Sequence, residues 1–240
     1  MRNRRLASFI VATIFLPWLA PAQQAVPFPK GETLEYTISW PSGLDVGEAR
    51  LVASPPEEPE NDDEAWLFRL HIEAAIPGYQ VRGEYRSLTT AELCTLEFRR
   101  ESVRGKRRAE EKTTVDQDHH EAHRTAIGGD EEQVFSVPRS ARDGLAYLYF
   151  LRSELAQGRI PPEGTVLYGA PYKIRFTPAG TEQVELGGEQ VEADQLMVTI
   201  EGPMSETTFV VLIARDPART PVRITVPLEP GNFSMELVRE

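Results

Sequence analysis

The sequence is poor in cysteine, which limits the chemistry and the cross-links that it can carry. Cys94 is the one cysteine among 240 residues, so no disulfide can form within the chain. Its neighbours Leu93 and Leu96 are apolar and predict a buried, unreactive thiol. A chain of this length can bury a sizeable core without disulfides or a structural metal.

Long hydrophobic runs are also missing beyond the N-terminus. No segment after residue 22 approaches the roughly 18 consecutive apolar residues of a membrane-spanning helix, so we expect a mature chain that does not span a membrane. Residues 1–22 have the pattern of a signal peptide, which has a basic start, a short apolar run and a small-residue cleavage site. These parts are Arg2, Arg4 and Arg5, then residues 9–16, then Ala20-Pro21-Ala22.

This signal peptide predicts an exported protein, either periplasmic or secreted. No cysteine follows the cleavage site directly, since Cys94 lies far downstream, so we expect no lipid anchor. Positive charge is scarce, with 26 basic residues against 37 acidic ones and a net charge of −11. Such a balance argues against nucleic acid and anionic membrane surfaces as partners and favours a soluble, acidic protein.

Alternation of apolar and polar residues is abundant, and its period of two is typical of half-buried strands. About a dozen such segments are separated by turn residues. Residues 55–64 (PPEEPENDDE) hold three prolines and six acids and predict a solvated acidic loop. The predicted strands are 32–40, 46–53, 66–76, 79–90, 93–103, 107–115, 165–168, 172–176, 183–186, 190–200, 207–214, 222–226 and 232–238, with less regular strands between 116 and 137.

One helix, at about residues 141–157, interrupts these strands. Asp143 can cap its N-terminus, and Gly158 with the prolines that follow can end it. Residues 145–151 are apolar on nearly every side of the helix, so we expect the helix to be buried.

Strands and helix together predict a mainly β fold. We expect a single domain over residues 23–240, formed by a large curved antiparallel sheet or open barrel packed around the one buried helix. The helix would then fill the concave face of the sheet. Any pocket for an apolar ligand would lie at this junction, with Tyr147, Tyr149 and Phe150 as candidate lining residues.

Catalytic motifs are scarce. The chain has no G-x-S-x-G nucleophile elbow and no glycine-rich phosphate loop. Three of its four histidines fall within residues 116–123, and on a strand His119, Glu121 and His123 would share one face. Two imidazoles and a carboxylate can hold a divalent metal, so these residues are candidate metal ligands; a polar, water-facing strand is the alternative.

Three blocks of the sequence resemble an exported bacterial family known as domain of unknown function 3108. The resemblance implies an envelope-associated, single-domain, β-rich protein and no catalytic residues. Its motif residues Asp143, Arg152, Asp216 and Pro221 would have structural roles, with Asp143 as a helix cap and 216–221 as a hairpin turn. The blocks are Gly31-Glu32-x-Leu34-x-Tyr36 with Gly47-Glu48-Ala49, Asp143-x-Leu145 through Leu151-Arg152 to Gly158, and Asp216-x-x-Arg219-x-Pro221-Val222.

The leading functional prediction is a non-catalytic periplasmic binding or carrier protein. Its partner would be a lipid or other apolar ligand, or an envelope protein, and no cofactor is expected. The first alternative is a metal-assisted hydrolase that uses His119, Glu121 and His123. The second is a structural or assembly protein of the cell envelope.

Overall fold

A computed structural model describes residues 26–56, 58–59, 65–126, 132–203, 205–228 and 231–238. The predicted signal peptide and most of the acidic loop at 55–64 lie outside the described residues. Fifteen strands and one helix follow in chain order: β1 (Glu32–Ser39), β2 (Asp45–Ser54), β3 (Trp66–Ile76), β4 (Tyr79–Thr89), β5 (Thr95–Arg104), β6 (Arg107–Asp116), β7 (Glu121–Ala126), β8 (Glu132–Ser136), β9 (Arg142–Asp143), α1 (Gly144–Ala156), β10 (Gly164–Leu167), β11 (Pro171–Leu186), β12 (Glu189–Glu201), β13 (Glu206–Ala214), β14 (Pro221–Leu228) and β15 (Gly231–Leu237).

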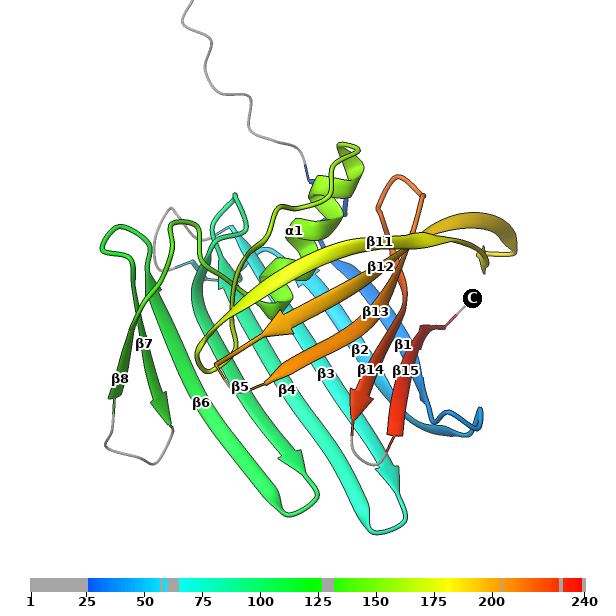
Figure 1. Cartoon of the computed structure of the whole chain (residues 1–240), viewed down its shortest axis with the longest axis horizontal. Helices are drawn as coiled ribbons and strands as arrows, with labels where there is room; N and C mark the ends of the chain where they lie inside the picture. The colour runs from blue at the N-terminus through cyan, green and yellow to red at the C-terminus, as the bar shows by residue number, and fades with distance from the viewer. Residues whose placement is uncertain are drawn as a thin grey trace, which may run out of the picture.

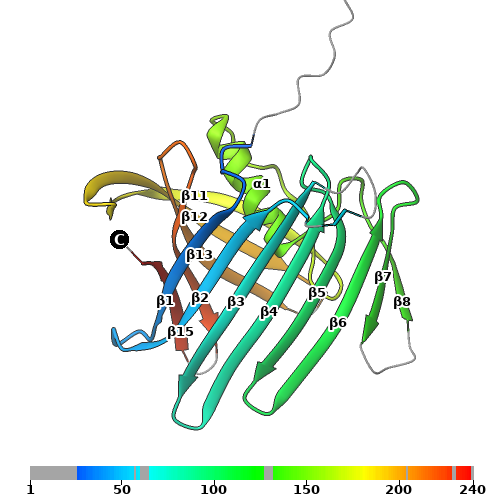
Figure 2. The same cartoon turned by 180° about the vertical axis from the view of Figure 1, so that it is seen from behind.

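All fifteen strands form one sheet, in the order β8-β7-β6-β5-β4-β3-β2-β1-β15-β14-β13-β12-β11-β10-β9. Neighbouring strands are antiparallel, apart from the short parallel pair β9–β10. The sheet curls, so that β11–β13 cross in front of β2–β5 in Figure 1 and behind them in Figure 2. The mainly β prediction of a large curved sheet around one helix is therefore confirmed.

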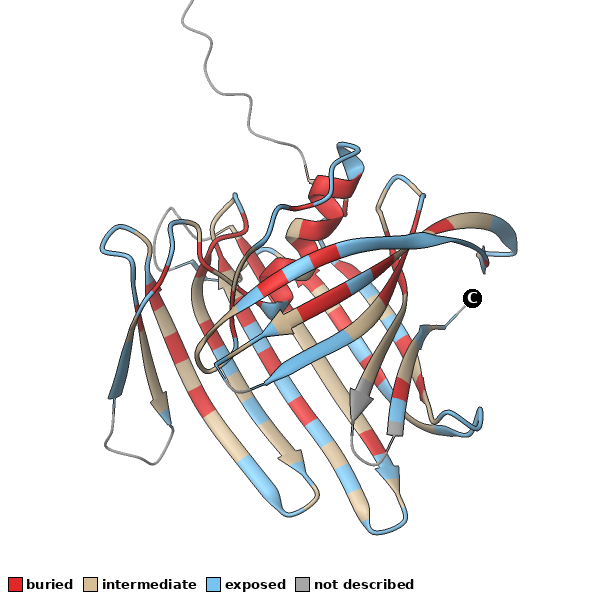
Figure 3. Cartoon of the chain, viewed as in Figure 1, coloured by how far each residue is buried: buried red, intermediate tan, exposed pale blue. Residues whose placement is uncertain are grey.

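The helix α1 lies between the two walls of this curled sheet (Figure 1). Leu145 and Tyr149 pack in a core cluster with residues of β1–β5, whereas Tyr147, Leu151 and Leu155 pack in a second cluster with β10–β13. A helix held between two apolar walls must be apolar on opposite sides, which explains the pattern in the sequence. Figure 3 shows the helix and the strand segments around it as buried, while the far ends of β3–β6 are more exposed.

The sheet remains open, because its two end strands β8 and β9 do not pair with each other. The end at β9 nevertheless meets the inside of the sheet at β5, where the Thr95 amide donates to the Ala141 carbonyl at 3.0 Å. Beyond this contact the β10–β11 turn, with Tyr168 and Gly169, lies against β5–β7 through side chains. We call this junction of the β10–β11 turn with β5–β7 the seam.

One predicted break in the sheet is wrong. The side-chain pattern predicts separate strands at residues 172–176 and 183–186. They belong instead to β11, which pairs along nearly its whole length with β12 and absorbs the irregularity as a bulge between Pro178 and Gly180. Since β10 pairs with β11 only as far as Ile174, no described strand needs an amide from Pro178 on that edge.

The other predicted elements agree with the structure to within a few residues. The helix begins at Gly144, not 141, because Ala141 and Arg142 continue the sheet edge before the chain turns into the helix. Cys94 is buried, as predicted from its apolar neighbours. Among the described residues, no helix has the length and apolar character needed to cross a membrane.

Candidate functional site

The N-terminus of α1 is attached to the sheet through Asp143, which is fully buried. One carboxylate oxygen accepts from the amides of Leu145 and Ala146 at 2.8 and 3.2 Å, as an N-cap does. The other accepts from the hydroxyls of Ser87 on β4 and Thr95 on β5, at 2.5 and 2.7 Å. Burial raises the pKa of Asp143, although these four hydrogen bonds act to lower it.

The C-terminal half of α1 is attached through Arg152, which has no exposed surface. Its guanidinium donates to both carboxylate oxygens of Glu32 on β1, at 2.6 and 2.7 Å. It also donates to the backbone carbonyls of Ala218 and Arg219, in the turn between β13 and β14. One side chain thus joins the helix, the first strand and a late turn.

The turn that Arg152 contacts is itself closely hydrogen-bonded. Asp216 accepts from the amide and hydroxyl of Thr220, at 2.8 and 2.7 Å, and the Tyr36 hydroxyl donates to the Pro221 carbonyl at 2.9 Å. Of the four motif residues named from the sequence, Asp143 and Arg152 attach the helix to the sheet, and Asp216 and Pro221 lie in the turn that Arg152 contacts. Asp143 is at the N-cap, and residues 216–221 form the turn, as predicted.

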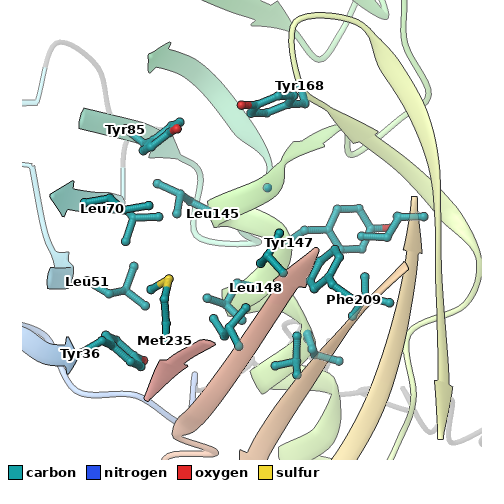
Figure 4. A pocket seen from close by; sticks show the side chains of 18 of the residues that line it. Tyr36, Leu51, Leu70, Tyr85, Leu145, Tyr147, Leu148, Tyr168, Phe209 and Met235 are labelled. Atoms are coloured by element: carbon teal, nitrogen blue, oxygen red, sulfur yellow. The ribbon is translucent and has the colours of Figure 1, made fainter. Parts of the chain in front are cut away.

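Below α1 the walls of the sheet leave a cavity of about 340 Å³ (Figure 4). This volume is within the range of small-ligand pockets, roughly 300–1,000 Å³. Several of the large apolar side chains that line it are only partly buried. The apolar lining comprises Leu51, Leu70, Ile72, Phe98, Leu145, Leu148, Leu151, Ile174, Phe176, Val198, Phe209, Val211, Ile224, Val226 and Met235.

One end of the cavity is polar and lies at the seam. Figure 4 shows the hydroxyls of Tyr85 and Tyr168 pointing toward each other there. Arg104 donates to the Tyr168 hydroxyl at 3.4 Å. Partial burial lowers the pKa of Arg104, but its tyrosine neighbours Tyr168 and Tyr85 outweigh that effect, so its pKa is raised and the guanidinium stays charged.

A buried ion cluster holds the seam behind these tyrosines. Glu111 on β6 forms an ion pair with Arg100 at 3.0 Å and accepts a hydrogen bond from Arg124 Nε at 2.8 Å. The Arg100 guanidinium also lies over the Tyr168 ring, 4.6 Å from its centroid. The side chains of this cluster come from β5, β6 and β7 and contact the turn that carries Tyr168. They therefore hold Tyr168 in position.

Of the three predicted lining residues, the structure places only Tyr147 at the cavity. Tyr149 points to the β1–β4 wall, where its ring stacks on Phe68 with centroids 3.9 Å apart. Phe150 packs under the guanidinium of Arg142, 3.9 Å from the ring centroid. The other residues of α1 that line the cavity are Gly144, Leu145, Leu148 and Leu151, none of which was a candidate from the sequence.

Of the three candidate metal ligands, Glu121 and His123 lie together on β7, 3.8 Å apart, and His119 does not join them. His119 lies in the turn before β7, because the Asp116 carboxylate accepts from the amides of Asp118 and His119 and closes the turn. Its ring pairs with Asp116 at 2.8 Å, whereas His123 pairs with Glu132 at 3.1 Å. In the described part of the chain, no three His, Cys, Asp or Glu side chains gather in a way that could hold a metal ion.

Arg104 is the site residue that sequence reasoning missed. It belongs to a basic run at residues 99–108, in which Arg99, Arg104, Arg107 and Arg108 are all exposed at the β5–β6 hairpin. Strand alternation contained the missing signal, because Phe98, Arg100 and Arg104 are separated by even numbers of residues and so share the inner face.

Comparisons with known proteins show which structures and which family this chain is similar to. No curated protein sequence matches the chain significantly. The structure is similar to a β-barrel-like protein of domain of unknown function DUF1849 from Brucella abortus, with a TM-score of 0.59, 7% identity, and coverage of 86% of this chain and 95% of that one. A protein with a YmcC-like fold from Bacteroides fragilis matches over 89% and 97% at 10% identity, but its TM-score of 0.33 is too low to compare folds.

A family model provides the sequence relationship. It matches residues 35–238, from β1 to just beyond β15, and so includes α1 and every strand that lines the cavity. The expected resemblance is thereby confirmed. The chain belongs to the family of proteins of unknown function DUF3108.

Proposed function

We propose that this chain is a non-catalytic binding protein of the cell envelope that takes an apolar ligand into the cavity between α1 and the curled sheet. The observation that carries the proposal is the cavity itself, about 340 Å³ in volume and lined by large apolar side chains. A core that served only stability would be expected to fill such a space, since protein interiors pack nearly as densely as organic crystals.

The position of the cavity supports the same function. Asp143 and Arg152 hold α1 at both ends, so the helix forms a fixed roof over the apolar walls. A preformed pocket of this kind binds without the cost of ordering its walls. The signal-peptide pattern of residues 1–22 supports a location in the cell envelope.

The hydrolase alternative lacks its third ligand, because Glu121 and His123 lie 3.8 Å apart but His119 pairs with Asp116 and does not join them. It stays a prediction from the sequence alone. An assembly role stays a prediction as well, since the described residues do not indicate which surface would contact a partner.

Filling the cavity is expected to abolish most of the binding. Leu148 faces the cavity from α1, so a Leu148→Trp substitution would occupy the ligand's space without displacing packed atoms. The protein, expressed as the full chain and purified after export, is titrated with the apolar fluorophore N-phenyl-1-naphthylamine. We expect fluorescence enhancement with the parent protein and affinity lower by about tenfold or more in the variant.

A matched control is Met197→Trp, which adds the same side chain to the exposed outer face of β12. It should bind the fluorophore like the parent protein, and both variants should keep the parent melting temperature to within a few degrees. An absence of enhancement with the parent, or equal affinity in L148W, would contradict the proposed function.

A further inference from the structure

The cavity is apolar along its walls but carries a cation at one end. Among the described residues that line it, Arg104 is the one with a charged side chain. Its hydrogen-bonding neighbour is the Tyr168 hydroxyl, and no carboxylate of the described residues lies within ion-pair distance of it. The Arg104 side chain is exposed at the mouth of the cavity, and none of the described carboxylates balances its charge.

A second unbalanced cation lies beside the first. Arg107 on β6 is directly opposite Arg104 on β5, so the two side chains leave the same face of the sheet. Arg107 also has no ion-pair partner among the described residues. Both side chains are exposed, and like charges directly across a strand pair are destabilising, so an anion bound between them would relieve their repulsion.

A neighbouring arginine on the same strand, Arg100, does have an acidic partner. Arg100, on the same face of β5, meets the buried carboxylate of Glu111 at 3.0 Å. The chain as a whole carries a net charge of −11, so acidic residues are plentiful. Within the described part of the chain, the lack of an acidic partner for Arg104 and Arg107 is therefore local to this hairpin.

The apolar part of the cavity sets the size of the ligand. A methylene group occupies about as much volume as a water molecule in the liquid, roughly 30 Å³, so 340 Å³ accommodates a chain of about ten to twelve carbon atoms. Figure 4 shows Tyr85 and Tyr168 at one end of this space and Tyr36 and Met235 toward the other. A single alkyl chain can extend between them.

We propose that the ligand is a single-chain amphiphile with an anionic headgroup, whose carboxylate or phosphate is bound by Arg104 and Arg107 at the seam while its chain fills the cavity. This inference rests on the proposed function and adds the headgroup to it. Guanidinium groups suit this task because they donate to carboxylate and phosphate oxygens in a fixed fork. The Tyr85 and Tyr168 hydroxyls supply further donors at the same end.

The test compares ligands of one chain length by displacement of N-phenyl-1-naphthylamine from the full-chain protein. Dodecanoate is expected to bind about tenfold more tightly than the neutral 1-dodecanol, and rising ionic strength should reduce the difference. A third ligand, lauroyl-lysophosphatidylglycerol, separates the two sources of the anion. Tighter binding than dodecanoate would identify a phospholipid headgroup, and weaker binding a free fatty acid.

Variants of the β5–β6 hairpin assign the preference to its residues. The double variant R104Q/R107Q should lose the tenfold advantage of dodecanoate and keep its affinity for dodecanol. Arg107→Gln alone should lose part of that advantage and leave the fold intact, because Arg107 makes no ion pair with a described residue. The matched control is Arg108→Gln, which removes the same charge from the outer face of β6.

The outcomes separate the two proposals. Equal binding of dodecanoate and dodecanol by the parent protein, or an unchanged preference in R104Q/R107Q, would overturn the anionic headgroup and leave apolar binding standing. Failure of every ligand to displace the fluorophore would overturn both.

Discussion

Replacing Arg152 with methionine is expected to destabilise the protein by about 3–5 kcal/mol, the typical result of removing one partner from a buried ion pair. The change leaves Glu32 nearly buried without its cation, and leaves the carbonyls of Ala218 and Arg219 without their donor. Methionine keeps much of the side-chain volume, so the loss reports on charge and hydrogen bonding. Urea unfolding followed by circular dichroism measures it.

Two further variants make this result specific. Arg159→Met removes an arginine that pairs with Glu154 near the same end of the helix but lies largely in solvent, and it should have a much smaller effect. The double variant E32L/R152M should recover much of the lost stability, since apolar replacement of both partners removes the uncompensated charge. A loss below about 1 kcal/mol in R152M would contradict the role assigned to this pair.

Replacing Asp143 with alanine is expected to cost about 3 kcal/mol, combining the loss of the helix N-cap with two buried hydroxyls left unsatisfied. Those hydroxyls belong to Ser87 and Thr95, which have no exposed surface. Asp143→Asn is the matched control. It keeps an acceptor for the helix amides and can donate to the rotated hydroxyls, so it should retain most of the stability.

Asp143 also makes a pH-dependent contribution that the asparagine variant lacks. Burial raises the pKa of this carboxyl in the folded state above its value in the unfolded chain, which is about 3.9. The folded state then binds the proton more tightly, so this contribution to stability is fully present below the unfolded value and is lost as pH rises through the folded value. The stability of the parent relative to D143N should therefore fall with rising pH, and a difference that rose instead would contradict the direction of the shift.

Local signals in the sequence were sufficient for most of the fold. The strand Trp66–Ile76 and the helix with its cap at Asp143 follow from side-chain periodicity and capping, which depend only on neighbouring residues. The continuity of β11 could not be predicted this way, because it depends on an unbroken partner strand that bridges the bulge after Pro178.

The candidate site was predictable in place but not in detail. The junction of helix and concave sheet followed from one apolar helix among many strands, and the cavity does lie there. Which helix residues face it depends on how the two walls rotate the helix, and this excluded Tyr149 and Phe150. The pairing of Arg152 with Glu32, 120 residues away, has no local signal at all.

The order of strands in the sheet makes the protein a circularly permuted meander. Among the described strands, each hydrogen-bonded neighbour is also the next strand along the chain, with one exception: β1 pairs with β15. The two ends of the sheet, β8 and β9, meanwhile follow each other directly in sequence. The entropic cost of closing a long loop therefore falls mainly on one strand pair, β1–β15. The contacts of Arg152 with Glu32 and with the 216–221 turn lie beside this pair and stabilise it.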